Sequence, residues 1–492
     1  MKVDCRSVKF FFAIAVSALT WSLGSTSATS ANDTLGAYRH LVELESTRAF
    51  SPDLVHDLQV TESATRAALA LGRTKDARAA APLLASMQSS RDTSTRAMST
   101  YGYGLLAGHT TLEVTAVIRM LRDRQAAVRT AAVDAAQRTI FSKQTRLALL
   151  VDPLIALMRG DRDPIVRGRA AVALAAFVDT ADASTVGAAV NAAFVRETTP
   201  SVRWHEAWAL GRAFPTIPTK TQIATGLADK DELVRMEFLV VAGRHGDPNL
   251  AKIIEPLVKD PAWRVAESAI ESIKRLAGVS RTEHLTAIPD GVLTPPPVPD
   301  DQSSPLPRPD VAGPVHRPTP AEARLDIPLH ITRASAFDGP MPGLHPRVRI
   351  GTTKGPIVVR LYPEWAPLTV ANFLNLTNRG YFDSLRWFRI VPNFVAQTGD
   401  PKNDGEGDAG YMIPAEENPL EQRTGIISMG LNYEKGDAIR DSAGTQFYLT
   451  MSPQMHLNRA FTVFGEIESG FNTLGRLIES DTMTKVEQIS DD

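Results

Sequence analysis

The chain is 492 residues long, carries a formal net charge of −2 and contains 22% charged residues without long runs of one sign. Its length exceeds one typical domain and corresponds to roughly three domains' worth of material. The balanced charge argues against a nucleic-acid-binding surface, so we expect protein or peptide partners.

The N-terminal segment has the pattern of a targeting signal. Basic residues precede the apolar run FFFAIAVSALTWSL, and small residues follow it up to Ala31. The run is shorter than the roughly 18 apolar residues that a membrane span needs. We therefore predict that residues 1–31 are a cleaved signal peptide, that no membrane span is left, and that the protein is exported to the periplasm. An uncleaved N-terminal anchor is the alternative.

Residues 32–284 show helical spacing of apolar residues and an internal repeat. In each repeat a capping-type residue or an acid stands four positions before an arginine that opens an apolar run, and the arginines recur every 29 to 38 residues. The D-x-x-V-R pattern resembles short HEAT-like repeats, which implies an all-α solenoid that offers a surface to a protein partner. The repeat arginines are expected to pair with the acid one turn earlier or to cap the neighbouring repeat: Arg66, Arg96, Arg129, Arg167, Arg203, Arg235 and Arg264.

Residues 285–346 are predicted to be a linker. The stretch from Pro289 to Pro346 holds 15 of the 33 prolines. Proline fixes φ and lacks a backbone donor, so this segment is expected to be an extended spacer or a disordered connection. A ligand for a proline-recognition module is a less favoured alternative.

After Pro346 the apolar spacing changes to the alternation of β-strands. The stretch RVRIGTTKGPIVVRLYP predicts two strands joined by a turn at Gly355, and APLTVANFLNLTNRG predicts a helix that ends at Gly380. Further strands are predicted at LRWFRIV, GIISMG, GTQFYLTMS and AFTVFGEI, and a second helix at FNTLGRLI. Many short strands with two helices indicate a closed or nearly closed antiparallel β-barrel over residues 347–490.

Several motifs of this region occur in the order found in cyclophilins. The stretches FRIVPNFVAQTGDP, DSAGTQFYLT and HLNRAFTVFGEI resemble the arginine signature, the glutamine strand and the V-F-G segment of that family. The resemblance implies a cyclophilin-type barrel, peptidyl-prolyl cis-trans isomerase activity on proline-containing polypeptides, and no metal or cofactor. Several departures together leave the rate and the sequence preference open. Phe461 replaces a usual histidine, His456 a tryptophan, Leu431 an asparagine and Tyr448 a phenylalanine, and the stretch LNYEKGDAIRD widens the loop before the glutamine strand.

The resemblance also assigns roles to individual residues. Isomerisation of an X-Pro bond has a barrier of about 18–20 kcal/mol, and a cation near the proline nitrogen stabilises the twisted bond more than the planar one. This role falls to Arg389, which stands between apolar residues in a predicted central strand, where an unpaired charge is costly. Arg389, Phe394 and Gln397 are the implied catalytic residues, and Val395, Gly430, Gln446, Tyr448, Leu457 and Phe461 the implied substrate-binding residues.

Each assignment has a structural alternative. Arg389 could be an exposed strand residue that reaches water. Phe394, Leu457 and Phe461 could be ordinary core, and Gln446 could make a barrel hydrogen bond. Three functions therefore remain open: an isomerase of exported proteins, a non-catalytic scaffold that binds proline-containing segments, or a solenoid that the barrel merely stabilises. The joint presence of Arg389, Phe394 and Gln397 favours the isomerase, since a pure binder could have lost the arginine.

Overall fold

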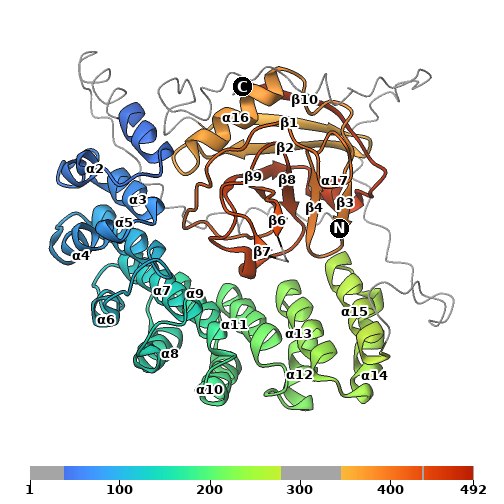
Figure 1. Cartoon of the computed structure of the whole chain (residues 1–492). Coiled ribbons are helices and arrows are strands. Elements are labelled where there is room, and N and C mark those ends of the chain that lie inside the picture. Colours follow the sequence, from blue (N-terminus) through green and yellow to red (C-terminus); the bar gives the residue numbers. More distant parts are fainter. Residues whose placement is uncertain (1–37, 279–344, 435–436, 491–492) are drawn as a thin grey trace, which may run out of the picture.

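The computed structural model describes residues 38–278, 345–434 and 437–490. The predicted signal peptide and nearly all of the predicted linker lie outside these residues. The described residues form a helical array, residues 38–278, and a barrel domain, residues 345–490, which lies against the array (Figure 1). No helix in these ranges is long and apolar enough to cross a membrane.

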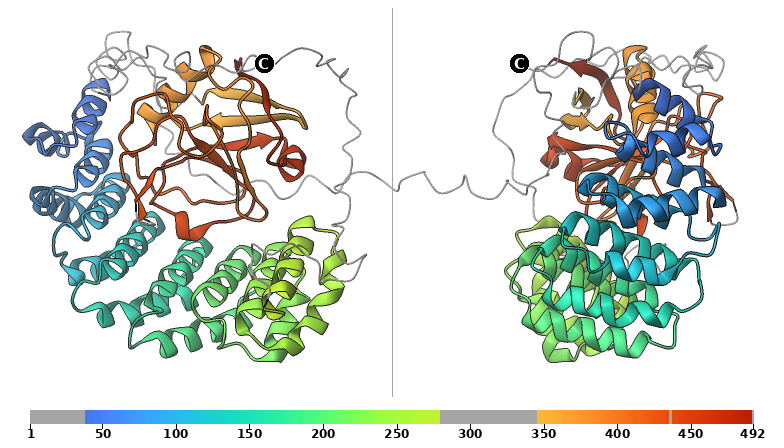
Figure 2. Two further views of the ribbon diagram at one scale, coloured as in Figure 1. Left: turned by 45° about the vertical axis from the view of Figure 1, so that its right-hand side comes forward. Right: turned by 90° about the vertical axis from the view of Figure 1, so that its left-hand side faces the viewer.

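The helical array curves around the barrel domain in two layers (Figures 1 and 2). Each helix of the inner layer packs beside the next inner helix along the array, which confirms the all-α prediction; the resemblance to HEAT-like repeats stays a prediction. A helix over residues 38–46 precedes both layers. The inner helices are α3 (Ala64–Thr74), α5 (Thr93–Leu105), α7 (Ala126–Phe141), α9 (Pro164–Leu174), α11 (Pro200–Ala213), α13 (Glu232–His245) and α15 (Trp263–Leu276). The outer helices are α2 (Pro52–Asp57), α4 (Ala80–Ser89), α6 (Val114–Met120), α8 (Val151–Gly160), α10 (Ala183–Arg196), α12 (Lys220–Leu227) and α14 (Ala251–Ile254).

Most of the repeat arginines connect consecutive repeats. Arg129 of α7 places Nε 2.6 Å from Asp161 Oδ2, and its Nη1 donates to Asp123 O at 2.9 Å. The partner is thus an acid that precedes the following inner helix and not a residue one turn earlier, where Arg129 has Gln125. Of the two expected roles, the contacts show the link to the neighbouring repeat. The same arrangement joins Arg96 to Asp123, Arg167 to Glu197, Arg203 to Asp229 and Arg235 to Asp260.

The barrel domain is an eight-stranded antiparallel sheet in the order β10-β1-β2-β9-β5-β8-β4-β3. Its two edge strands approach each other where Arg386 pairs with Thr482, so the barrel is nearly closed. Aromatic side chains of Phe373, Phe382 and Phe447 fill its centre. The strands are β1 (Arg347–Thr352), β2 (Gly355–Leu361), β3 (Arg389–Val391), β4 (Val395–Thr398), β5 (Ile426–Met429), β8 (Phe447–Thr450), β9 (Val463–Ser469) and β10 (Met483–Ile489), and β6 (Tyr433–Glu434) pairs with β7 (Asp437–Ala438) in a separate hairpin.

The two predicted helices of the barrel domain are present as α16 (Pro367–Asn378) and α17 (Phe471–Arg476). Gly380 has φ 66°, a left-handed conformation that ends α16 as predicted. Strands β4 and β10 were not predicted as separate elements. The expectation of a central strand around Arg389 is wrong, because β3 is an edge strand of three residues and Arg389 is exposed.

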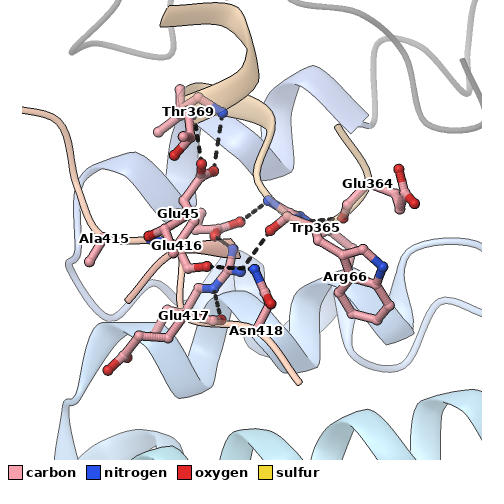
Figure 3. A network of polar contacts seen from close by, with 12 residues as sticks. Glu45, Arg66, Glu364, Trp365, Thr369, Ala415, Glu416, Glu417 and Asn418 are labelled. Atoms are coloured by element: carbon pink, nitrogen blue, oxygen red, sulfur yellow. Dashed lines mark hydrogen bonds and ion pairs between the residues drawn. The ribbon is translucent and has the colours of Figure 1, made fainter. Parts of the chain in front are cut away.

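Buried charges join the N-terminal end of the array to the barrel domain (Figure 3). Arg66 Nη1 donates to Glu364 O at 3.1 Å, and Arg73 Nη2 donates to Trp365 O at 2.8 Å. Both arginines also pair with Glu45 of the first helix. Burial alone would raise the pKa of Glu45, but the two guanidinium groups hold it below its ordinary value.

The loop after Ala415 contributes two carboxylates to this contact. Glu416 accepts hydrogen bonds from Leu368 N at 3.1 Å and Thr369 N at 2.8 Å, so it caps the first turn of α16 (Figure 3). Glu417 lies 2.8 Å from Lys75 Nζ of the array. Burial raises the pKa of Glu417, but Lys75, Arg138 and Arg440 outweigh it and lower the pKa to about 2. The array and the barrel domain therefore share one buried polar network.

Candidate active site

Arg389 begins a chain of polar side chains on the outer face of the barrel. It is paired with Gln397 in the β3–β4 hairpin, and its Nη1 donates to Gln397 Oε1 at 3.2 Å. Gln397 Nε2 donates to Gln446 Oε1 at 3.0 Å, and Gln446 Nε2 donates to Gly405 O at 2.8 Å. Each glutamine thus accepts with its oxygen and donates with its nitrogen. This series of hydrogen bonds orients the Gln397 amide so that its Oε1 atom faces Arg389.

Phe394 provides an apolar surface beside this guanidinium group. The Arg389 Cζ atom lies 5.3 Å from the centre of the Phe394 ring. Phe394 also stacks on His456, with ring centres 5.8 Å apart and planes 11° apart. Phe394 is half-buried, so part of the ring is open to a ligand. A cation and an apolar ring therefore lie together, which is the arrangement that the expected roles of Arg389 and Phe394 need.

Leu457, Phe461 and Tyr448 extend the apolar surface inwards. Leu457 is half-buried, whereas Tyr448 and Phe461 are 4% and 7% exposed and meet edge to face at 5.9 Å. Burial raises the pKa of Tyr448, so its phenol is neutral at physiological pH. The accessible part of this surface thus consists mainly of Leu457 and Phe394.

Val395 and Gly430 were expected to line the substrate groove, but neither offers a side chain to a ligand there. Val395 is 1% exposed and belongs to the barrel core, so its side chain has almost no surface for a ligand. Gly430 lies against the glutamine pair: a Cβ atom there would come within 3.1 Å of Gln446 Cβ and 3.3 Å of Gln397 Nε2. The absence of a side chain at Gly430 leaves room for the hydrogen-bonded pair Gln397 and Gln446.

Residues of the helical array also reach this site, which the sequence did not indicate. Partial loss of hydration, together with the positive charges of Arg212 and Arg244, lowers the pKa of His456 to about 4. The imidazole is therefore neutral at pH 7. Asn393, next to Phe394, donates to Arg264 O at 2.8 Å. No local pattern could have found these contacts, because more than 120 residues separate the partners.

The candidate site has the character of a binding surface for a peptide bond. It offers one guanidinium group, two amides and an apolar floor. In the part of the chain that the structure describes, no group of three or more His, Cys, Asp or Glu side chains is placed to hold a metal ion.

Comparison with known proteins gives the family of the barrel domain. Residues 347–491 match the family model "Cyclophilin type peptidyl-prolyl cis-trans isomerase/CLD". Peptidyl-prolyl cis-trans isomerase B of Bacillus subtilis is 41% identical over 132 residues, which are 26% of this chain and 88% of that protein. A peptidyl-prolyl cis-trans isomerase of Helicobacter pylori is 36% identical over 141 residues, 28% of this chain and 83% of that protein.

Among solved structures, a cyclophilin type peptidyl-prolyl cis-trans isomerase of Cryptosporidium parvum is 28% identical, with a TM-score of 0.28; the match covers 30% of this chain and 100% of that one. Through its barrel domain, the chain belongs to the cyclophilin-type peptidyl-prolyl cis-trans isomerase family.

Proposed function

We propose that the protein is a peptidyl-prolyl cis-trans isomerase that acts on X-Pro bonds of exported polypeptides. The observation that carries the proposal is the chain from Arg389 through Gln397 to Gln446, which holds a guanidinium group beside the exposed part of Phe394. Family membership supports the same activity.

The proposed mechanism needs no covalent step. Phe394 and Leu457 receive the proline ring, and Arg389 donates to the proline nitrogen as the C–N bond twists and the nitrogen regains its lone pair. This hydrogen bond strengthens in the transition state, so it lowers the barrier rather than merely tightening substrate binding. Gln397 and Gln446 keep the guanidinium group in place, which reduces the reorganisation needed during the twist.

The helical array has a second proposed role, the binding of a protein partner. Its inner layer is occupied by the barrel domain of the same chain (Figure 2). We therefore assign the partner surface to the outer layer, which includes α6, α8, α10 and α12. The export pattern at residues 1–31 is the basis for a periplasmic location.

The test compares the full chain with its Arg389→Ala variant in exchange NMR of a short Ala-Pro peptide. Arg389 is exposed, so the variant should fold as the parent does and lose most of the isomerisation rate. A parent that binds the peptide but does not isomerise it would favour the non-catalytic scaffold instead. Equal rates in parent and variant would show that Arg389 has no part in the reaction.

A further inference from the structure

The last repeat arginine departs from the contacts of the arginine before it. Arg235 bonds to Asp260 of the next repeat and to Asp229 O within the array. Arg264 follows the same sequence pattern, but it is the second residue of α15, whereas Arg235 is the fourth residue of α13. No repeat follows α15 in the described part of the array. Its Nε donates to Met451 O of the barrel domain at 2.8 Å, and its nearest carboxylate oxygen, in Glu232, lies 3.6 Å from Nη1. Figure 1 shows α15 next to β3 and β4.

This contact lies one step from the candidate active site. Met451, whose carbonyl accepts from Arg264, donates its backbone N–H to Phe394 O at 2.9 Å. Asn393, the residue before Phe394, donates Nδ2 to Arg264 O at 2.8 Å and to Ser268 Oγ at 2.9 Å. α15 therefore contacts the turn of Phe394 in two ways, through Met451 and through Asn393.

Asn393 is suited to this position because it adopts φ 55°, a left-handed conformation that asparagine tolerates better than most residues. Its carbonyl accepts from Gln454 Nε2 at 2.9 Å. The turn thus has one set of contacts to its own domain and another to the array.

The segment that carries Leu457 is held by the array as well. Met455 is 1% exposed and is packed in the hydrophobic core of the array. Arg459 pairs with Asp134 of α7, and Arg138 Nη2 donates to Arg459 O at 3.1 Å. Leu457 lies between these two anchors. Both apolar surfaces of the candidate site, Phe394 and Leu457, are therefore positioned by helices outside the barrel.

We propose that Arg264 is a positioning residue of the isomerase, and that the last helix of the array is a structural part of the proline-binding site. The inference rests on the proposed function. Arg264 touches no substrate; it acts by fixing Met451, and through Met451 the backbone of Phe394. Small displacements of groups that hold a substrate are enough to reduce rates strongly, even when the fold is preserved.

The test compares Arg264→Met with Arg235→Met in the full chain. The two arginines are a comparable pair, since both lie in the first turn of an inner helix and their side chains are 14% and 15% exposed. Both variants should lower the thermal midpoint. Only Arg264→Met should reduce kcat/KM for a short Ala-Pro peptide, by about tenfold and mainly through KM, because the displaced Phe394 receives the proline ring. Arg264→Lys, which keeps a cation able to reach Met451 O, should recover part of this loss.

Asn393→Gly provides a second variant on the barrel side if Arg264→Met does not fold. Glycine adopts the same left-handed φ but lacks the amide that reaches α15, so the same rise in KM is expected. Parent values of kcat/KM in Arg264→Met or in Asn393→Gly would overturn the inference while leaving the proposed function intact.

Peptide affinity, measured by titration, separates the remaining outcomes. A parent that binds the Ala-Pro peptide without isomerising it would contradict the proposed function, and weaker binding by Arg264→Met alone would still support the positioning role. A parent that neither binds nor isomerises the peptide would overturn both.

Discussion

The two glutamines beside Arg389 determine how well its guanidinium group is oriented. Gln446 is fixed by the carbonyls of Gly405 and Gly407, at 2.8 and 3.1 Å, and it fixes Gln397 in turn. An arginine held in this way loses little freedom when it meets the twisted bond, so its hydrogen bond contributes more to the transition state.

Replacing Gln446 by leucine should therefore slow isomerisation without removing the catalytic cation. One hydrogen bond is worth about 0.5–1.5 kcal/mol, so kcat/KM should fall by about 2- to 12-fold, less than in Arg389→Ala. The measurement is exchange NMR on the Ala-Pro peptide. Gln488→Leu, at an exposed position of β10, is the control and should keep the parent rate. An unchanged rate in Gln446→Leu would mean that Arg389 does not depend on the glutamine chain.

At the residue scale, the sequence motifs brought together residues that are indeed neighbours: Arg389, Phe394, Gln397 and Gln446 are linked by direct contacts. The prediction that Arg389 lies in a central strand is nevertheless wrong, because β3 is an edge strand, where a charge meets water at little cost. The apolar residues beside Arg389 suggested a buried strand, and only the pairing order of the sheet shows otherwise. Period-2 patterns report which face is buried but not which strand is outermost.

Small residues set the separation of helices in the array. Gly104 of α5 lies so close to α7 that a Cβ atom would come within 2.6 Å of Ala135 Cα. A glycine within a helix normally lowers its stability relative to alanine, which is the better helix former. Here the close approach of two backbones requires glycine.

Gly104→Ala should consequently destabilise the protein although it favours the isolated helix. Overpacking against a backbone costs about 1–3 kcal/mol, which exceeds the gain of at most about 1 kcal/mol in helix propensity. The thermal midpoint should fall. Gly160→Ala is the matched control, because no atom lies within 4 Å of a Cβ atom at this last residue of α8, and its midpoint should stay equal or rise. If both variants behave alike, helix propensity and not packing decides the stability at these sites.

Elements with a strong pattern were predictable, and elements with a weak one were not. The inner helices and α16 have apolar spacing and clear ends, and both were found from the sequence. Strand β10 has the polar sequence MTKVEQI, and only Met483 and Val486 of it are buried. Its place in the barrel depends on pairing with β1, more than 100 residues earlier, which no local pattern reveals.

The largest gap between sequence and structure concerns the molecule as a whole. A proline-rich linker suggests two domains joined by a spacer, and nothing in the repeats or in the barrel motifs indicates that the two share a buried interface. The explanation lies in the ends of the repeat series. Arg66 and Arg264 follow the same sequence pattern as the arginines between them, yet they donate to Glu364 O and Met451 O of the barrel domain. The sequence pattern predicts that each arginine has a partner, but not whether this partner lies in the next repeat or in the barrel domain.

The interface leads to a prediction about a chain cut within residues 279–344 by an engineered protease site. The two pieces should stay together at neutral pH, because Arg73 and Glu45 are 0% and 2% exposed in the intact protein and Trp263 packs against the barrel core. Size-exclusion chromatography should give one peak. Salt of about 1 M should not divide this peak, since buried pairs are screened far less than exposed ones.

Acid should separate the pieces. The direction of this pH dependence follows from the lowered pKa values of the interface carboxylates. The pKa of Glu417 is lowered from its ordinary value of 4.5 to about 2, and that of Glu45 is lowered as well. A carboxylate with a depressed pKa stabilises the bound state fully above its ordinary pKa, and this contribution is lost as the pH falls towards the depressed value. The association should therefore weaken between about pH 4.5 and about pH 2. At about pH 3 we expect two peaks, with far-UV circular dichroism showing that the helical piece is still folded. Two peaks already at neutral pH would show that the linker, and not the buried network, keeps the array and the barrel domain together.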